Sequence, residues 1–171
     1  MENSKIIDKT WFAIYVKSRN EKKVGNRLNE QKIEFYLPVL RVLKKWSDRK
    51  KWIDEPLFRS YIFVRIAQNE YLKVLQTEGV VRFITFEGKL VAVPKQQIEA
   101  IKIFLDEIEP ENNADIEWKK GQLVEIISGN MTGLTGYLME FKGKFKVSIS
   151  IDAINRSIMV QIPKNKVRII E

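Results

Sequence analysis

The segment Glu55–Arg65, which reads Glu-Pro-Leu-Phe-Arg-Ser-Tyr-Ile-Phe-Val-Arg, is the feature that most constrains how this chain can fold. Its second half alternates as a strand does, because successive side chains of a strand point to opposite faces. One face carries the aromatic residues Tyr61 and Phe63. The other face is a β-branched row typical of a protein core, formed by Ile62, Val64 and Ile66.

The aromatic face of this predicted strand allows two interpretations. Helices could cover both faces of the sheet, in which case Tyr61 and Phe63 are ordinary core residues. Alternatively, the two aromatic residues belong to an exposed apolar patch, which in a water-soluble protein usually marks a surface that binds a partner.

The composition is that of a globular protein, with 171 residues of which 44% are hydrophobic and 30% are charged. This length suffices for one large or two small domains. We find no apolar run of about eighteen residues that could cross a membrane. The segment 1–10 is polar and lacks the apolar centre of a signal peptide. Together with the absence of cysteine, these features lead us to expect a cytoplasmic protein.

The chain contains neither histidine nor cysteine. The commonest nucleophiles, general bases and zinc ligands are therefore missing. A carboxylate pair or a Ser–Lys dyad could still support catalysis, but we find no motif for either, so we predict a protein that is not an enzyme and has no cofactor or metal site. The net charge of +8 instead favours a polyanionic partner, usually nucleic acid, over a merely soluble basic surface.

Residues 1–110 predict an α+β domain in which helices pack against an antiparallel sheet, in the order β-α-β-β-α-β-β-α. Strands are expected at 11–17, 34–42 and 61–66, where aromatic and β-branched residues are frequent. A hairpin is expected over 80–93, around the turn Glu87-Gly88.

Three helices are predicted in the same domain. A capping box formed by Ser18 and Glu21 predicts a helix that begins at Arg19 and ends near Gln31. The other two follow from the helical spacing of apolar residues. They cover 69–76, with Leu72 and Leu75 facing inward, and 94–108, with Ile98, Ile101, Leu105 and Ile108 along one side.

Basic residues gather where the first predicted strand runs into the first helix. We call this group the basic corner; its members are Lys17, Arg19, Lys22, Lys23 and Arg27. A converging set of cations can contact the phosphates of a nucleic acid. The alternative is an ordinary solvated helix face, which is what most charge runs are.

A second basic segment, 41–52, predicts a hairpin that projects from the sheet, because Ser47-Asp48 is a turn signal. Trp46 and Trp52 flank this turn. They could stack on nucleic-acid bases or pair with each other across the hairpin. We predict nucleic-acid contacts for four of its basic residues: Lys44, Lys45, Arg49 and Lys50.

The remainder of the chain has a different character. Residues 111–117 are acidic and poor in apolar side chains, which is typical of a linker. Residues 118–171 contain short apolar runs separated by glycine-rich turns, which predict a small five-stranded β-barrel. Its strands are expected at 122–128, 137–141, 145–151, 157–162 and 167–170.

Both parts resemble the NusG family of transcription elongation factors, and the resemblance covers nearly the whole chain in the right order. The first part carries Trp-Phe-Ala-Ile-Tyr-Val-Lys, Phe-Tyr-Leu-Pro, Glu-Pro-Leu-Phe-Arg-Ser-Tyr-Ile-Phe-Val and Gly-Val-Val-Arg-Phe, as the N-terminal (NGN) domain of that family does. The second carries Lys-Lys-Gly-Gln-Leu-Val-Glu-Ile-Ile-Ser-Gly and Thr-Gly-Leu-Thr-Gly, as the SH3-like KOW domain does. A KOW motif alone is shared with ribosomal proteins, so the combination carries the resemblance.

Within the family, the chain is more similar to the specialised RfaH and UpxY antiterminators than to housekeeping members. Housekeeping NusG proteins usually carry Phe-Pro-Gly-Tyr where this chain has Phe-Arg-Ser-Tyr. The preceding Trp-Ser-Asp-Arg-Lys-Lys also resembles the UpxY proteins of capsule operons.

The resemblance implies that an apolar patch docks on the clamp helices of the RNA polymerase β′ subunit. The matching positions are Tyr61, Phe63, Phe86 and Ile98. Binding there bridges the polymerase cleft and stabilises the closed clamp, which disfavours pausing.

The resemblance also implies that the basic corner contacts a hairpin of the non-template DNA strand. The matching positions are Lys17, Lys23, Arg27, Gln31 and Thr77. Glu78 stands where a basic residue would assist binding, so a different DNA sequence is expected.

We therefore predict a monomeric transcription antitermination factor that suppresses pausing and termination at specific operons, such as those for polysaccharide biosynthesis. The alternatives are a housekeeping NusG that acts with Rho and a KOW-type RNA-binding module. KOW domains of such proteins can bind a ribosomal small-subunit protein, a question that the sequence leaves open. The Val-, Ile- and Phe-rich runs favour a committed barrel over one that refolds into helices.

Overall fold

The computed structural model describes residues 8–45, 49–106, 121–141, 144–162 and 164–170. Residue contacts divide the chain into two compact units, Met1–Val93 and Pro94–Glu171. None of the described helices is long and apolar enough to span a membrane.

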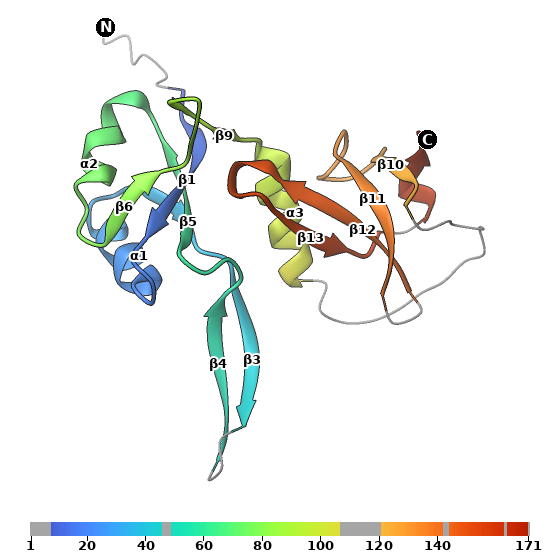
Figure 1. Cartoon of the computed structure of the whole chain (residues 1–171), viewed down its shortest axis with the longest axis horizontal. Helices are drawn as coiled ribbons and strands as arrows, with labels where there is room; N and C mark the ends of the chain where they lie inside the picture. The colour runs from blue at the N-terminus through green and yellow to red at the C-terminus, as the bar shows by residue number, and fades with distance from the viewer. Residues whose placement is uncertain (1–7, 46–48, 107–120, 142–143, 163, 171) are drawn as a thin grey trace, which may run out of the picture. The chain divides into compact units, whose positions relative to one another are not determined.

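The first unit is built on a five-stranded antiparallel sheet (Figure 1). The central strand β1 pairs with β5 along one edge and with both β6 and β9 along the other, and β2 pairs with the far side of β5. The strands are β1 (Thr10–Val16), β2 (Glu34–Tyr36), β5 (Tyr61–Ile66), β6 (Val80–Phe83) and β9 (Ala92–Val93). The predicted antiparallel sheet with flanking helices is confirmed.

One face of this sheet packs against helices α1 (Glu21–Glu30) and α2 (Tyr71–Leu75). The predicted β-branched row of β5 lies in this core, because Ile62, Val64 and Ile66 are all buried in one apolar cluster. The helices contribute Val24, Leu28 and Val74 to the same cluster.

Both helices differ in detail from the prediction. Arg19 has a φ of +62°, a left-handed conformation that no helix continues, so α1 begins two residues later with Asn20 as its N-cap and without a side-chain cap. The predicted capping box is therefore wrong. A short 3₁₀ turn (Gln68–Glu70) precedes α2, in which Val74 is buried and the predicted core residue Leu72 is 62% exposed.

The predicted strand 34–42 is two strands, because Leu37 and Pro38 interrupt it. After the break, β3 (Val39–Lys45) pairs with β4 (Lys50–Pro56) as a two-stranded antiparallel ribbon. This ribbon extends away from the five-stranded sheet (Figure 1), as predicted for the basic hairpin.

The predicted hairpin over 80–93 is also divided. Its outer parts, β6 and β9, both pair with β1, and only β7 (Thr85–Phe86) and β8 (Lys89–Leu90) form a hairpin around Glu87-Gly88.

The second unit contains helix α3 and five strands in one antiparallel sheet of order β13-β12-β11-β10-β14. All five predicted strands are present. No pairing between β13 and β14 closes the sheet among the residues described, so a β-rich sheet is established and SH3-like closure stays a prediction. The elements are α3 (Lys95–Asp106), β10 (Leu123–Ile126), β11 (Thr135–Phe141), β12 (Lys144–Ile151), β13 (Arg156–Val160) and β14 (Val167–Ile169), with 3₁₀ turns at Asp152–Ile154 and Lys164–Lys166.

Helix α3 contacts β12 and β13, and Gln97 Nε2 lies 3.4 Å from Asp152 Oδ2. The sequence places this helix in the first domain, 1–110, whereas its contacts group it with the C-terminal sheet. Residue 108 and the predicted linker 111–117 lie outside the described residues.

Candidate nucleic-acid and partner-binding surfaces

The aromatic face of the first sheet is partly accessible. Tyr61 is half-buried, and its ring packs edge-on against Tyr15, with ring centroids 5.5 Å apart. The Arg82 guanidinium lies over the Tyr15 ring, 5.7 Å from its centroid. These contacts follow from the strand register, in which Tyr15 is opposite both Tyr61 and Arg82.

Phe63, by contrast, is fully buried. Its ring stacks on Tyr36 at a centroid distance of 6.5 Å and meets Phe58 edge-on at 6.2 Å. For Phe63 the structure thus agrees with the interpretation of a covered core residue.

The four positions expected to bind polymerase therefore differ in accessibility. Phe86 is 70% exposed at the turn of the β7–β8 hairpin, and Tyr61 is half-buried. Phe63 on β5 and Ile98 on α3 are fully buried. Only Tyr61 and Phe86 of the four present surface to solvent.

The loop before Tyr61 is fixed by a contact that sequence reasoning missed. Ser60 has a φ of +67°, and its backbone N–H donates to Glu21 Oε1 at 2.8 Å. The Ser60 carbonyl accepts from the Val16 N–H at 2.9 Å. Glu21 is buried because it serves this loop, not because it caps its own helix. No local pattern in the sequence signals this contact, because its two partners are 39 residues apart.

The turn between α2 and β6 contacts two residues of the basic corner, Lys17 and Arg27. Gly79 has a φ of +97°, and a Cβ built there would lie 2.7 Å from Val24 Cγ2. Its carbonyl accepts from the Lys17 N–H at 2.8 Å, which joins the end of β1 to this turn. Only glycine satisfies both the backbone angle and the close approach of α1.

Arg27 reaches the same turn from α1. Its Nη1 donates to the Glu78 carbonyl oxygen at 2.9 Å, and its Nη2 lies 2.6 Å from Glu78 Oε2. The guanidinium is therefore paired with both the backbone and the carboxylate of one residue.

Gln31 and Thr77 lie together beside this pair. The Thr77 hydroxyl lies 3.2 Å from Gln31 Oε1 and 2.9 Å from the Lys73 carbonyl oxygen, and Lys73 Nζ donates to the Gln31 carbonyl at 2.7 Å. Thr77 is buried, so its role here is to hold Gln31. The side-chain nitrogen Nε2 of Gln31 makes no hydrogen bond to any described residue and stays available to a ligand.

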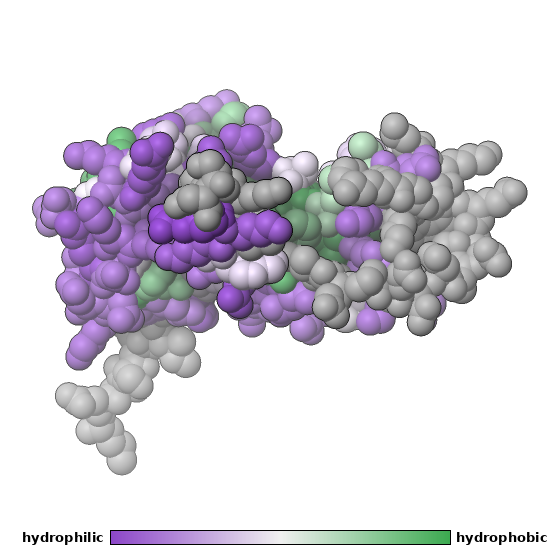
Figure 2. All heavy atoms as spheres, turned by 90° about the horizontal axis from the view of Figure 1, so that it is seen from below, coloured by the Kyte–Doolittle hydropathy of each residue, from purple (hydrophilic) through white to green (hydrophobic). Residues whose placement is uncertain are grey.

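The other members of the basic corner are exposed and make no ion pair within the described part of the chain. They are Lys17, Arg19, Lys22 and Lys23. Of the predicted DNA-contact residues, Lys17 and Arg27 both contact the α2–β6 turn, through the Gly79 carbonyl and Glu78, and Gln31 contacts Thr77 of the same turn. In Figure 2 the visible face of the first unit is mostly hydrophilic.

The two-stranded ribbon of β3 and β4, which we call the basic ribbon, carries its positive charge near the turn that joins the strands. The strand register places Lys44 opposite Lys51 and Lys45 opposite Lys50, an arrangement of like charges that is unfavourable without a counter-charge. Lys50, Lys51 and Arg49 are exposed.

Trp52 is 55% exposed, with the Arg41 guanidinium 5.7 Å from its ring centroid. Leu43 is its cross-strand neighbour in the ribbon. The alternative in which Trp46 pairs with Trp52 involves Trp46, which lies outside the described residues. An exposed indole beside cations is a suitable stacking surface for a base.

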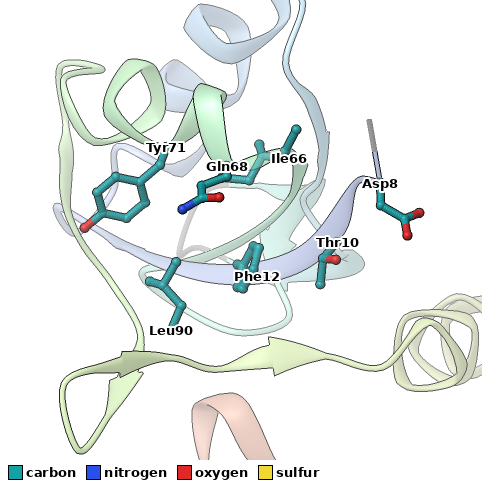
Figure 3. Close-up of a pocket in the computed structure, with 8 residues that line it drawn as sticks. Asp8, Thr10, Phe12, Ile66, Gln68, Tyr71 and Leu90 are labelled. Atoms are coloured by element: carbon teal, nitrogen blue, oxygen red, sulfur yellow. The ribbon is translucent and has the colours of Figure 1, made fainter. Parts of the chain in front are cut away.

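A shallow cavity of about 580 Å³ lies elsewhere on the first unit, between β1 and α2 (Figure 3). Phe12, Tyr71 and Leu90 form its apolar wall, and Asp8 and Gln68 add polar atoms. Beside it, partial burial acts to raise the pKa of the Glu70 carboxyl, but hydrogen bonds from the Ala67 N–H and Lys9 lower that pKa overall. Through these contacts Glu70 joins the 3₁₀ turn before α2 to Lys9, which precedes β1.

Comparison with known proteins agrees with this architecture. Residues 9–102, more than half of the 171-residue chain, match the sequence model of the family described as "Transcription termination factor nusG". A structure described as "Domain interaction in Thermotoga maritima NusG" is similar over 95% of this chain and 98% of its own, with a TM-score of 0.54 and 22% identity, which is a likeness of fold. A structure described as "Crystal Structure of MjSpt4:Spt5 complex conformation A" aligns over 94% of this chain and 97% of its own at 18% identity, but its TM-score is only 0.31.

Proposed function

Because the chain belongs to the NusG family of transcription factors, we propose that it is an elongation and antitermination factor that binds RNA polymerase and the non-template DNA strand. The observation that carries the proposal is the basic corner. Exposed cations from the end of β1 and from α1 surround a turn whose shape depends on Gly79. An NGN-like fold with this corner suits a factor that contacts DNA while it is held on polymerase.

Polymerase binding is assigned to the clamp helices of the β′ subunit. Tyr61 and Phe86 are accessible for this contact as the chain stands. Phe63 and Ile98 are buried, so their participation requires a rearrangement that exposes them. Docking through the accessible pair is therefore the first step of the proposed interaction.

DNA contact is assigned to the basic corner and the basic ribbon. The corner offers the unpaired cations and the free Gln31 amide to phosphates and bases of a single strand. The ribbon adds exposed lysines and the Trp52 ring. Charge and stacking together fit nucleic acid better than an acidic protein surface, which would make no use of an exposed indole.

A specialised role similar to that of RfaH and UpxY is supported by Ser60. This residue occupies a left-handed conformation at the position where housekeeping relatives usually carry glycine. The proposed role is suppression of pausing and termination at specific operons, such as those for polysaccharide biosynthesis, by a cytoplasmic monomer. The proposed domains are 1–110 and an SH3-like KOW barrel at 118–171, and the latter could also engage a ribosomal small-subunit protein.

Two assays test the proposal. Purified protein should bind its cognate RNA polymerase, and single-round transcription through a long operon leader should show fewer pauses and terminations when the protein is added. More Rho-dependent termination would assign the chain to the housekeeping role. Binding to ribosomal RNA without binding to polymerase would assign it to the KOW-type RNA-binding class.

A further inference from the structure

Glu78 is the one acidic residue placed directly against a cation of the basic corner in the described residues. Its carboxylate lies 2.6 Å from Arg27 Nη2, where a phosphate oxygen would bind. The Glu78 side chain is 81% exposed and that of Arg27 is 33% exposed, so the pair lies at the surface. Such a pair contributes little to folding, at most about 1 kcal/mol.

We propose that the Glu78 carboxylate acts as an internal competitor that keeps Arg27 from binding the phosphate backbone of single-stranded DNA. The inference rests on the proposed function, since it concerns the DNA contact of the same corner. A strand that binds the corner must displace the carboxylate, or bind without a phosphate at Arg27. Glu78 thereby lowers affinity for DNA of any sequence and leaves more of the recognition to base contacts.

The geometry makes the carboxylate separable from the rest of the corner. Arg27 Nη1 donates to the Glu78 backbone carbonyl, a contact that any residue at position 78 provides. The backbone there is fixed by Gly79, whose carbonyl accepts from the Lys17 N–H. Glu78→Gln should therefore remove the charge while Arg27 stays in place.

The chain also offers a matched control. Glu30 lies on α1 three residues from Arg27, is exposed, and makes no ion pair with any described residue. Glu30→Gln changes the net charge of the protein by the same amount without releasing Arg27. Any effect of net charge alone will appear in both variants.

The test is fluorescence anisotropy with a labelled, mixed-sequence single-stranded DNA at salt concentrations from about 50 to 200 mM. Release of one cation should steepen the slope of log K against log salt by about 0.7 for Glu78→Gln, because each phosphate contact contributes that amount on single strands. Affinity at the lowest salt should rise about three- to tenfold. The slope for Glu30→Gln should stay that of the unmodified protein.

Two results would overturn the inference in different ways. Equal changes in Glu78→Gln and Glu30→Gln, or none in either, with clear binding by the unmodified protein, would refute the role of Glu78 and leave the DNA contact standing. No binding by any of the three proteins, together with intact polymerase binding, would remove the DNA contact from the proposed function and the inference with it. A melting curve for each variant confirms that the fold is retained.

Discussion

Gly79→Ala tests whether the basic corner is built as described. The substitution adds a Cβ at a φ of +97°, which costs about 1–2 kcal/mol for a residue with a side chain. The new atom would also lie 2.7 Å from Val24 Cγ2, closer than real Cβ contacts occur. Val24 is fully buried and cannot move outward, so overpacking adds about 1–3 kcal/mol.

Gly88→Ala is the matched control. Gly88 has a φ of +76°, and a Cβ there meets no atom within 4 Å. Gly88→Ala should therefore lower the free energy of unfolding only by the backbone cost, about 1 kcal/mol. The difference between the two variants isolates the contact with α1.

The assay is urea denaturation followed by circular dichroism, with the slope m checked for each variant. We expect Gly79→Ala to lower the free energy of unfolding by at least about 1 kcal/mol more than Gly88→Ala does. In a Val24→Ala background the loss caused by Gly79→Ala should shrink, because the clashing methyl is gone. Equal losses in the two glycine variants, with no change in the Val24→Ala background, would refute the close approach of α1 to this turn.

Three further outcomes are expected. Ser60→Gly should raise the free energy of unfolding by about 0.5–1 kcal/mol, because it relieves a left-handed serine, and a lowered midpoint in urea would contradict this. Phe63→Ala should lower the free energy of unfolding by about 3–5 kcal/mol, since the ring is fully buried. Phe86→Ala should change the free energy of unfolding by less than about 0.5 kcal/mol, because the ring is exposed, and should weaken polymerase binding. Arg27→Glu should reduce crosslinking to the non-template strand and leave polymerase binding intact, and unchanged crosslinking would count against the basic corner.

Much of the first sheet could be predicted from the sequence, because its strands alternate apolar and other side chains between their two faces. The alternation of β5 placed Ile62, Val64 and Ile66 in the core, where the structure has them. The basic hairpin and all five C-terminal strands were likewise evident from β-branched residues and turn signals.

The failures occurred where a distant contact overrode a local signal. Ser18 and Glu21 have capping-box spacing, but the Glu21 carboxylate accepts from Ser60, which is distant in sequence, and Arg19 leaves the helical region. In α2 the local pattern itself was misread, since Val74 is buried in the core and Leu72 is 62% exposed.

The candidate site was predictable only in part. The sequence alone could predict the cations of the basic corner, because the strand end and the helix start are adjacent in the chain. The pairing of Arg27 with Glu78 could not be predicted, since it depends on how the α2–β6 turn meets α1. The burial of Phe63 by Tyr36 and Phe58 depends in the same way on the path of the chain through β2 and the loop before β5.

The most direct test of the central claim is single-round transcription by the cognate RNA polymerase through a long operon leader, with the unmodified protein and with Phe86→Ala in parallel. The account predicts fewer pauses and terminations with the unmodified protein and a weaker effect with the variant, whose fold should be intact. No binding to polymerase and an unchanged pattern of pauses with either protein would contradict it.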